Sequence, residues 1–325
     1  MEQRTNRLDE QWAMEKPRVG ISSCLLGNNV RYDGGHQRDR FLTDTMGQFV
    51  QWVPVCPEVE CGLPTPRESM HLEGTAESPR LVTSRTERDV TERMEKWLEE
   101  RLDELEEEGL CGFIFKIKSP SSGMRDIPVF GGDGQQRTSR PGLFAGAFME
   151  RFPLLPVEDD GRLHDPGLRE NFIERIFALM RYREARRSVS GLVEFHAAHK
   201  LQIMAHSQEH LREMGQMVAR AGDVPDEELF PAYEEHLLNA LAGKSAPAKN
   251  VNVLHHILGY FKDDLDGWEK RELLEIVERY RKGLIPLIVP LTVVHHYVRK
   301  YEKTYLSQQT YLQPHPYELK LRNHA

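Results

Sequence analysis

The stretch PRVGISSCLLG, residues 17–27, begins as a short apolar run and breaks at Gly27. This pattern predicts a buried strand that runs into a loop. The stretch FVQWVPVCPE, residues 49–58, has the same form, because Pro57 ends its strand. A third stretch, LCGFIFKIKSPSSG at residues 110–123, predicts another strand, followed by a loop of Ser, Pro and Gly.

A helix is predicted between the second and third strands. In TSRTERDVTERMEKWLEERLDELEEEG, residues 83–109, apolar residues recur at helical spacing and Gly109 ends the pattern. The apolar face consists of Met94, Trp97, Leu98, Leu102 and Leu105. Strand, helix and strand in this order imply parallel strands joined by crossovers. We therefore predict an α/β domain with a mostly parallel sheet over residues 16–155.

The second half of the chain has a different character. From about residue 165, apolar residues recur at three- and four-residue spacing in successive segments, several of which end at Gly or Pro. This predicts an all-α helical bundle domain over residues 165–325. A segment rich in Pro and Gly at residues 152–167 predicts a linker, and the polar stretch GGDGQQRTSRPG at residues 131–142 predicts a flexible loop.

The composition narrows the classes of function. No run of about 18 apolar residues is present, and the first residues lack a signal-peptide pattern, so we expect a cytoplasmic protein without membrane contact. In that reducing compartment the 4 cysteines are expected to bind metal, act in catalysis or lie buried rather than form disulfides. A formal net charge of -8 argues against non-specific nucleic-acid binding as the main activity.

Two cysteines fall at the carboxyl ends of predicted strands, where ligands of open α/β sheets bind. Cys24 follows the first strand, Cys56 follows the second, and the loop at residues 119–123 follows the third. Cys61 lies close enough to Cys56 in sequence to fold back onto the same edge. Cys111 lies at the start of its strand, so we interpret it as a buried small residue.

The spacing of these thiols leaves several kinds of site open. Zinc usually takes closed sets of Cys and His ligands in two close pairs, and the sequence offers one close pair. An iron-sulfur cluster on three thiolates leaves one iron open to a substrate. Buried or redox-active thiols without metal are equally consistent with the spacing.

Longer motifs resemble a known family. The segments SSCLLGNNVRYDGGH, VPVCPEVECGLPTPRE and FIFKIKSPSSG, in this order, resemble the thiouracil desulfidase-like family, also called domain of unknown function 523. EFHAAHK, MAHS, HHILGYF, PLTVVHHYV and YLQPHPYELKLRN resemble the YbgA-type domain of unknown function 1722. The first resemblance implies a [4Fe-4S] cluster on three cysteines, which captures the sulfur of a thiolated pyrimidine and releases it by hydrolysis.

The resemblance also implies a set of cluster ligands. Cys24 and Cys56 match two of the family's cysteines, but Ser122 occupies the position of the third. We therefore predict a cluster on Cys24, Cys56 and Cys61, with Ser122 and Cys111 as the other candidates for the third ligand. Soft thiolates suit such clusters better than hard oxygen, which favours Cys61 over Ser122.

Catalytic and substrate-binding roles follow from what desulfuration requires. A base must activate water, and Glu58, beside Cys56, is the candidate, with a helix-capping role as the alternative. Ser119 and Ser121 are candidates for orienting the water or the substrate. The candidate substrate-binding residues are Asp33, Arg67, Lys116 and Ser122. The substrate is expected to be a thiolated base or nucleotide, either small or borne on RNA.

The helical half offers histidines at helical spacing, including His196, His199 and His206. Such residues bind metal or phosphate in some bundles, but they are more often satisfied core or surface histidines. This domain is expected to recognise a protein partner or present the substrate. Two functions therefore stay open: an iron-sulfur desulfidase, and a non-catalytic iron-sulfur or metal-binding module with a helical partner-binding domain.

Overall fold

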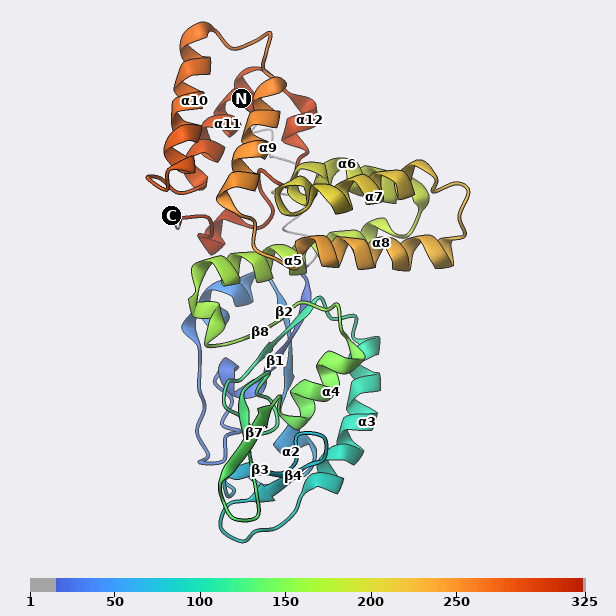
Figure 1. The fold of residues 1–325 in the computed structure, drawn as a ribbon, viewed down its shortest axis with the longest axis vertical. Coiled ribbons are helices and arrows are strands. Elements are labelled where there is room, and N and C mark those ends of the chain that lie inside the picture. Colours follow the sequence, from blue (N-terminus) through green and yellow to red (C-terminus); the bar gives the residue numbers. More distant parts are fainter. Residues whose placement is uncertain (1–15, 324–325) are drawn as a thin grey trace. The chain divides into compact units, whose positions relative to one another are not determined.

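The first part of the chain is organised by two four-stranded sheets (Figure 1). The computed structural model describes residues 16–323, which form two units, residues 16–164 and residues 165–323. Sheet A has the order β2-β1-β5-β8, and all of its pairings are parallel. Its strands are β1 (Arg18–Ser22), β2 (Gln51–Val55), β5 (Gly112–Phe115) and β8 (Val157–Asp159). The predicted α/β fold with a parallel sheet is confirmed.

Close packing at the centre of sheet A requires a glycine. Gly20 of β1 is paired with Phe113 of β5. A Cβ atom at Gly20 would lie 2.2 Å from the ring of Phe113, so any other residue there would displace this buried ring. Phe113 stacks on Phe115 with ring centroids 4.4 Å apart. These rings anchor the core of the unit.

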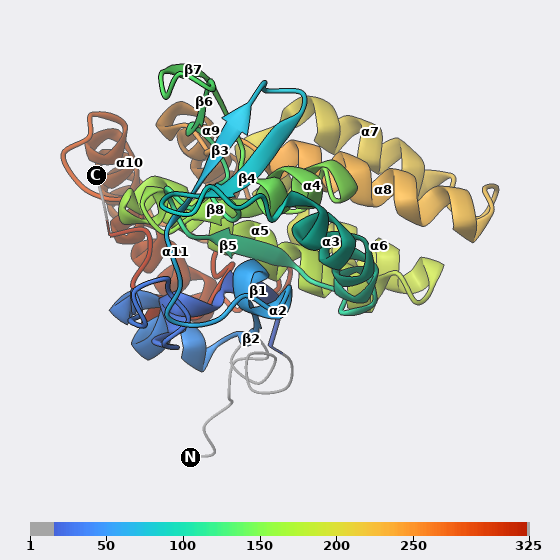
Figure 2. The same ribbon diagram turned by 90° about the horizontal axis from the view of Figure 1, so that it is seen from below.

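Two helices, α3 (Thr91–Glu107) and α4 (Leu143–Arg151), lie side by side against this core (Figure 2). The apolar face predicted for α3 packs into the core together with Phe144 and Phe148 of α4. The core also includes Val53, Val55, Leu72, Leu81, Ile127 and Val129 from strands of both sheets. The predicted amphipathic helix is confirmed.

Sheet B was not predicted from the sequence. Its strands are β3 (Met70–Gly74), β4 (Pro79–Thr83), β6 (Ile127–Phe130) and β7 (Gln136–Arg140), in the order β4-β3-β6-β7. Two antiparallel hairpins, β3/β4 and β6/β7, are joined by the parallel pair β3/β6. The prediction of a flexible loop at residues 131–142 is wrong, because β7 lies there. This polar edge strand is held by backbone pairing and carries no alternation of apolar residues.

The segment predicted as a linker also contributes to the fold. Strand β8 extends sheet A beside β5, and a short turn of 3-10 helix, η4 (Arg162–His164), follows it. The Asp160 carboxylate accepts hydrogen bonds from the backbone N–H of Ile117 and from Lys116 Nζ, at 2.8 and 2.9 Å. This acidic segment therefore fixes the loop that follows β5.

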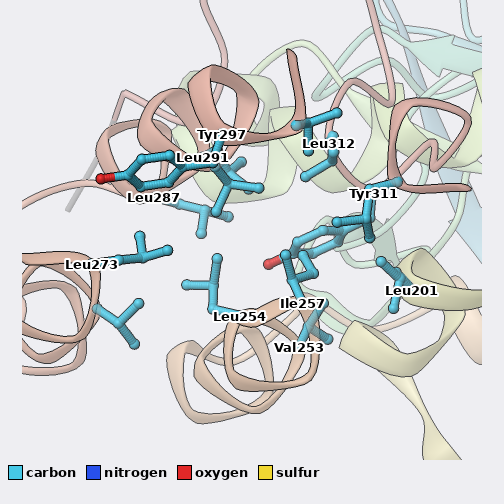
Figure 3. Close-up of a cluster of buried hydrophobic side chains, with 14 of the residues drawn as sticks. Leu201, Val253, Leu254, Ile257, Leu273, Leu287, Leu291, Tyr297, Tyr311 and Leu312 are labelled. Atoms are coloured by element: carbon cyan, nitrogen blue, oxygen red, sulfur yellow. The ribbon is translucent and has the colours of Figure 1, made fainter. Parts of the chain in front are cut away.

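The second unit is helical, as predicted. Its helices are α5 (Pro166–Ala185), α6 (Val189–His206), α7 (Gln208–Ala219), α8 (Asp226–Leu241), α9 (Pro247–Gly259), α10 (Gly267–Arg281), α11 (Ile288–Lys300) and α12 (Thr304–Ser307). Within residues 16–323 no helix is both long and apolar enough to cross a membrane. Figure 3 shows side chains of α9, α10 and α11 meeting in an apolar core that includes Leu254, Leu273 and Leu291.

A buried polar network joins α5 and α6 to the C-terminal segment. Arg322 donates to Glu170 at 2.9 Å and to Glu174 at 3.2 Å. Glu174 also contacts His206 Nε2 at 3.3 Å and accepts a hydrogen bond from Gln202 at 3.1 Å. Since a buried charge is stable only with such partners, the network fixes the last residues against the bundle.

His315, in the same segment, gives the helical unit a predicted sensitivity to acid. Burial, together with the nearby positive charge of Arg322, lowers the pKa of its imidazole to about 4. Below its ordinary pKa of about 6.5 the unfolded chain binds a proton that the folded chain does not. Stability is therefore lost as the pH falls from about 6.5 towards 4, by about 2 kcal/mol between pH 7 and pH 5.

The variant His315→Asn should remove this contribution, because an amide does not titrate. We expect the change in unfolding free energy between pH 7 and pH 5 to be smaller by about 2 kcal/mol in the variant. Urea unfolding followed by helix ellipticity at both pH values measures it. An identical change in both proteins would show that His315 is not the titrating group.

Candidate functional site

The carboxyl ends of β1, β2 and β5 meet at one edge of sheet A, and a cavity of about 450 Å³ opens there. Its walls come from the loops that follow the three strands and from the segment before β3. The lining residues that carry chemistry are Cys24, Arg31, Tyr32, Cys56, Glu58, Arg67, Lys116, Ser119 and Ser122. The cavity is large enough for a small ligand.

Two buried thiols face this cavity. Cys24 lies in a turn of 3-10 helix, η1 (Ser23–Leu26), directly after β1, and Gly27 ends the turn with a φ of 94°. Cys56 lies between β2 and the short helix α2 (Pro57–Glu60). Its backbone N–H donates to Glu60 Oε1 at 2.7 Å, which fixes the position of the thiol.

The thiols lie where burial disfavours their charged form. Burial raises the pKa of Cys24 to about 11, although Lys116 opposes the shift. Burial raises the pKa of Cys56 to about 12, and the negative charge of Glu58 adds to the shift. Without a bound cation, both side chains are therefore neutral thiols at pH 7, and metal binding must release their protons.

Glu58 connects the elements around the cavity. Its Oε1 accepts a hydrogen bond from Ser121 Oγ at 2.5 Å and lies 3.5 Å from Ser119 Oγ. Its Oε2 lies 3.5 Å from the Sγ of Cys56, which donates to it, and 3.7 Å from Arg67 Nη2. One buried carboxylate thus contacts Cys56, the serine loop after β5 and the side chain of Arg67.

The serine loop, residues 119–123, is held by the start of α4. The backbone N–H groups of Leu143 and Ala145 donate to the carbonyls of Pro120 and Ser121, at 3.2 and 3.1 Å. A Cβ atom at Gly142 would lie 2.5 Å from Ser121 O, so only glycine permits this approach. The same contacts satisfy backbone donors at the start of α4.

Arg67 and Lys116 bring positive charge to the cavity wall. Arg67 Nη1 donates to the carbonyl of Val30 at 3.0 Å, so its guanidinium bridges the Val30 segment and Glu58. Lys116 Nζ pairs with Asp160 at 2.9 Å. Each cation has an anionic partner, which offsets the cost of burial.

Several residues singled out from the sequence do not line the cavity. Cys61 is half-buried, donates to the carbonyl of Glu58 at 3.3 Å and packs against the apolar core. Cys111 is buried where β5 begins. Ser121 is fully buried behind the wall, where it contacts Glu58. Asp33 is exposed and lies 3.4 Å from Arg31 Nε, so its contact with the cavity is indirect.

Sequence reasoning missed three residues that contribute to this site. Arg31 and Tyr32 line the cavity, whereas the residue predicted from the same VRYDGGH segment was their neighbour Asp33. Asp160 anchors Lys116, but it lay in the supposed linker. The sequence signal that could have identified Arg31 and Tyr32 is a cation and an aromatic residue next to the Gly34-Gly35 turn.

A parallel sheet with two buried thiols and a buried carboxylate at its carboxyl edge defines the class of this domain: an α/β domain with a thiol-lined cavity. Residues 19–160 match the family model of 2-thiouracil desulfurase. Residues 200–316 match a model described as protein of unknown function DUF1722. The two-part resemblance inferred from the sequence motifs is confirmed.

Similar proteins include a curated relative and a solved structure. The uncharacterized protein YbgA of Escherichia coli strain K12 is 32% identical over 153 residues, which are 46% of this chain and 90% of YbgA. The chain therefore belongs to the YbgA family. A solved structure, of the [4Fe-4S]-dependent thiouracil desulfidase TudS, is 29% identical and covers 46% of this chain and 95% of its own, with a TM-score of 0.37.

The raised pKa values of Cys24 and Cys56 predict that, in the metal-free protein, the rate of their alkylation rises to a higher pH than for ordinary thiols. We expect the reaction of Cys24 and Cys56 with iodoacetamide to keep accelerating above pH 9, because their thiolate fractions are still rising there. Peptide mapping by mass spectrometry measures each site, with the denatured chain as control. A plateau at the same pH as in the denatured chain would contradict the assigned environment.

Proposed function

We propose that the first unit removes sulfur from a thiolated pyrimidine base or nucleotide by hydrolysis. The thiocarbonyl and one water give the carbonyl and hydrogen sulfide, so no oxidant or reductant is consumed. The match to the 2-thiouracil desulfurase family over residues 19–160 supports this reaction class. The observation that carries it is the buried Glu58 carboxylate 3.5 Å from the Cys56 sulfur, on the wall of one cavity.

The donor atoms of the cavity are compatible with an iron-sulfur cluster. Cys24 and Cys56 offer two soft sulfur ligands from adjacent strand ends. Ser122 offers a hydroxyl on the same cavity, at the position of the family's third cysteine. When bound, such a cluster supplies an iron with an open coordination position that binds the substrate's sulfur.

We propose that Glu58 acts as the general base. Its carboxylate accepts a proton from water, which makes the oxygen nucleophilic towards the thiocarbonyl carbon. Ser121 and Ser119 hold the carboxylate through Oε1. Arg67 and Lys116, which line the cavity, offer positive charge to an anionic substrate group.

The third ligand is assigned here to Ser122 in preference to Cys61. Ser122 lines the cavity, whereas Cys61 packs against the apolar core and donates its hydrogen bond to the carbonyl of Glu58. The sequence-based set of Cys24, Cys56 and Cys61 requires the Cys61 side chain to turn out of this packing. The geometry therefore favours the hydroxyl oxygen of Ser122, a hard ligand, over the softer sulfur of Cys61 as the third cluster ligand.

Five variants, at Cys24, Cys56, Cys61 and Ser122, test the ligand set after anaerobic cluster reconstitution of the full chain. Cys24→Ala and Cys56→Ala should lose iron, sulfide and visible absorption, because each removes a thiolate. Cys61→Ala should retain them, and Ser122→Cys should hold the cluster more firmly than wild type, because it restores a thiolate. Loss of the cluster in Cys61→Ala together with full retention in Ser122→Ala would restore Cys61 as the third ligand.

Substitution of Glu58 separates catalysis from cluster binding. Glu58→Gln keeps the acceptor for Ser121 but removes the base, so the rate of sulfide release should fall roughly 100-fold or more with the cluster retained. Glu92→Gln, at an exposed position on α3, controls for the loss of one negative charge. If Glu58→Gln turns over at the wild-type rate, the carboxylate is only a structural anchor.

A second candidate function has one observation in its favour. Ser122 replaces the third thiolate, which suits a non-catalytic iron-sulfur or metal-binding module with the helical unit as its partner-binding surface. Brown reconstituted protein that is inert towards thiolated bases, nucleotides and thio-modified RNA would favour this module.

The state of the thiols bears on the cellular compartment. Cys24, Cys56, Cys61 and Cys111, all within the described residues, are free thiols. Because free thiols are usual in a reducing compartment, we propose that the protein acts in the cytoplasm.

A further inference from the structure

A second group of potential metal ligands lies in the helical unit. His210 and Glu213 are on α7, and His236 is on α8. Each offers one ligand atom, and the three atoms all lie within 4.8 Å of one another. Two imidazoles and one carboxylate match the ligand sets that proteins use for zinc and related divalent ions.

The local structure brings these side chains together. Helices α7 and α8 are consecutive and lie side by side (Figures 1 and 2). His210 and Glu213 are three residues apart on α7, so they share one helix face. His236 Nδ1 lies 3.3 Å from Glu213 Oε2, and the rings of His210 and His236 have centroids 5.7 Å apart.

A hydrogen bond orients one of the rings. His210 Nδ1 lies 2.9 Å from Ser207 Oγ, the N-cap residue of α7. The same hydroxyl accepts the backbone N–H of His210 at 3.3 Å. When Nδ1 carries the proton and donates to Ser207, Nε2 has its lone pair available for a metal ion. Outer hydrogen bonds of this kind are usual for metal-binding histidines.

The site is open to solvent on one side. The side chain of His236 is 36% exposed and that of Glu213 is 45% exposed. An ion bound by the three side chains therefore keeps a coordination position for water or another ligand, as in zinc sites with three protein ligands. Because the site is exposed, the ion can enter while α7 and α8 stay packed together.

We propose that His210, Glu213 and His236 bind a divalent transition-metal ion of the zinc class, which cross-links α7 to α8. The site uses no thiol, so it is chemically distinct from the cysteine-lined cavity of the first unit. Its existence does not depend on the desulfuration reaction. Binding only to the folded state stabilises the helical unit by mass action.

Cobalt(II) is a suitable probe, because its spectrum separates the two kinds of site. Full-length protein freed of metal with a chelator is titrated anaerobically with Co²⁺. A nitrogen and oxygen site gives weak visible ligand-field bands, whereas thiolate ligands add strong near-ultraviolet charge-transfer bands. We expect the weak bands to saturate at one ion per chain, and added Zn²⁺ to remove them.

The variants locate the site. His210→Ala and His236→Ala should lose these bands, and Glu213→Gln should weaken binding roughly tenfold or more, while the near-ultraviolet signal of the thiols is unchanged. His255→Ala, at an exposed position on α9, is the matched control and should titrate like wild type. Identical titrations of wild type, His210→Ala and His236→Ala would overturn the proposal.

Thermal unfolding gives an independent readout. His210 and His236 are only half-buried and alanine is a good helix former, so the metal-free variants should unfold at close to the wild-type temperature. Added Zn²⁺ should raise the unfolding temperature of the helical unit in wild type and in His255→Ala, but not in the His210→Ala/His236→Ala double variant. An equal rise in the double variant would show that zinc acts elsewhere.

Discussion

The candidate site depends on the contacts of the Glu58 carboxylate. It accepts a hydrogen bond from Ser121 Oγ at 2.5 Å, lies 3.5 Å from the Cys56 sulfur and forms an ion pair with Arg67 at 3.7 Å. A buried carboxylate is tolerated only with such partners, so its burial obliges three separate loops to converge. The geometry that satisfies this charge also places the carboxylate beside the Cys56 thiol, in the cavity that Cys24 lines.

Much of the fold could be predicted from sequence, because it follows from local patterns. Short apolar runs that end in Gly or Pro gave β1, β2 and β5, and helical periodicity gave α3 and the helical unit. Sheet B was missed, since β7 is polar and exposed and is held by backbone pairing to β6. Strand β8 was missed because three residues in an acidic, Pro-rich segment carry no strand pattern.

The candidate site was predictable only in part. Cys24, Cys56 and the serine loop follow strands, and parallel strands bring their carboxyl ends to one edge. The direction of Cys61 depends on how the chain leaves α2, and its thiol bonds back to the Glu58 carbonyl. Asp160 acts on Lys116 from a distant segment, a pairing that only the tertiary structure supplies.

Isotope labelling tests the central claim most directly. Anaerobically reconstituted full-length protein is incubated in ¹⁸O-water with 2-thiouracil, 4-thiouridine monophosphate and a thio-modified RNA, and sulfide and the oxo base are quantified by mass spectrometry. Hydrolysis in the Glu58 cavity predicts equal amounts of sulfide and oxo base from at least one of these substrates, with one ¹⁸O atom in each product base. Cluster-loaded protein that releases no sulfide, or an oxo base without the label, would contradict the account.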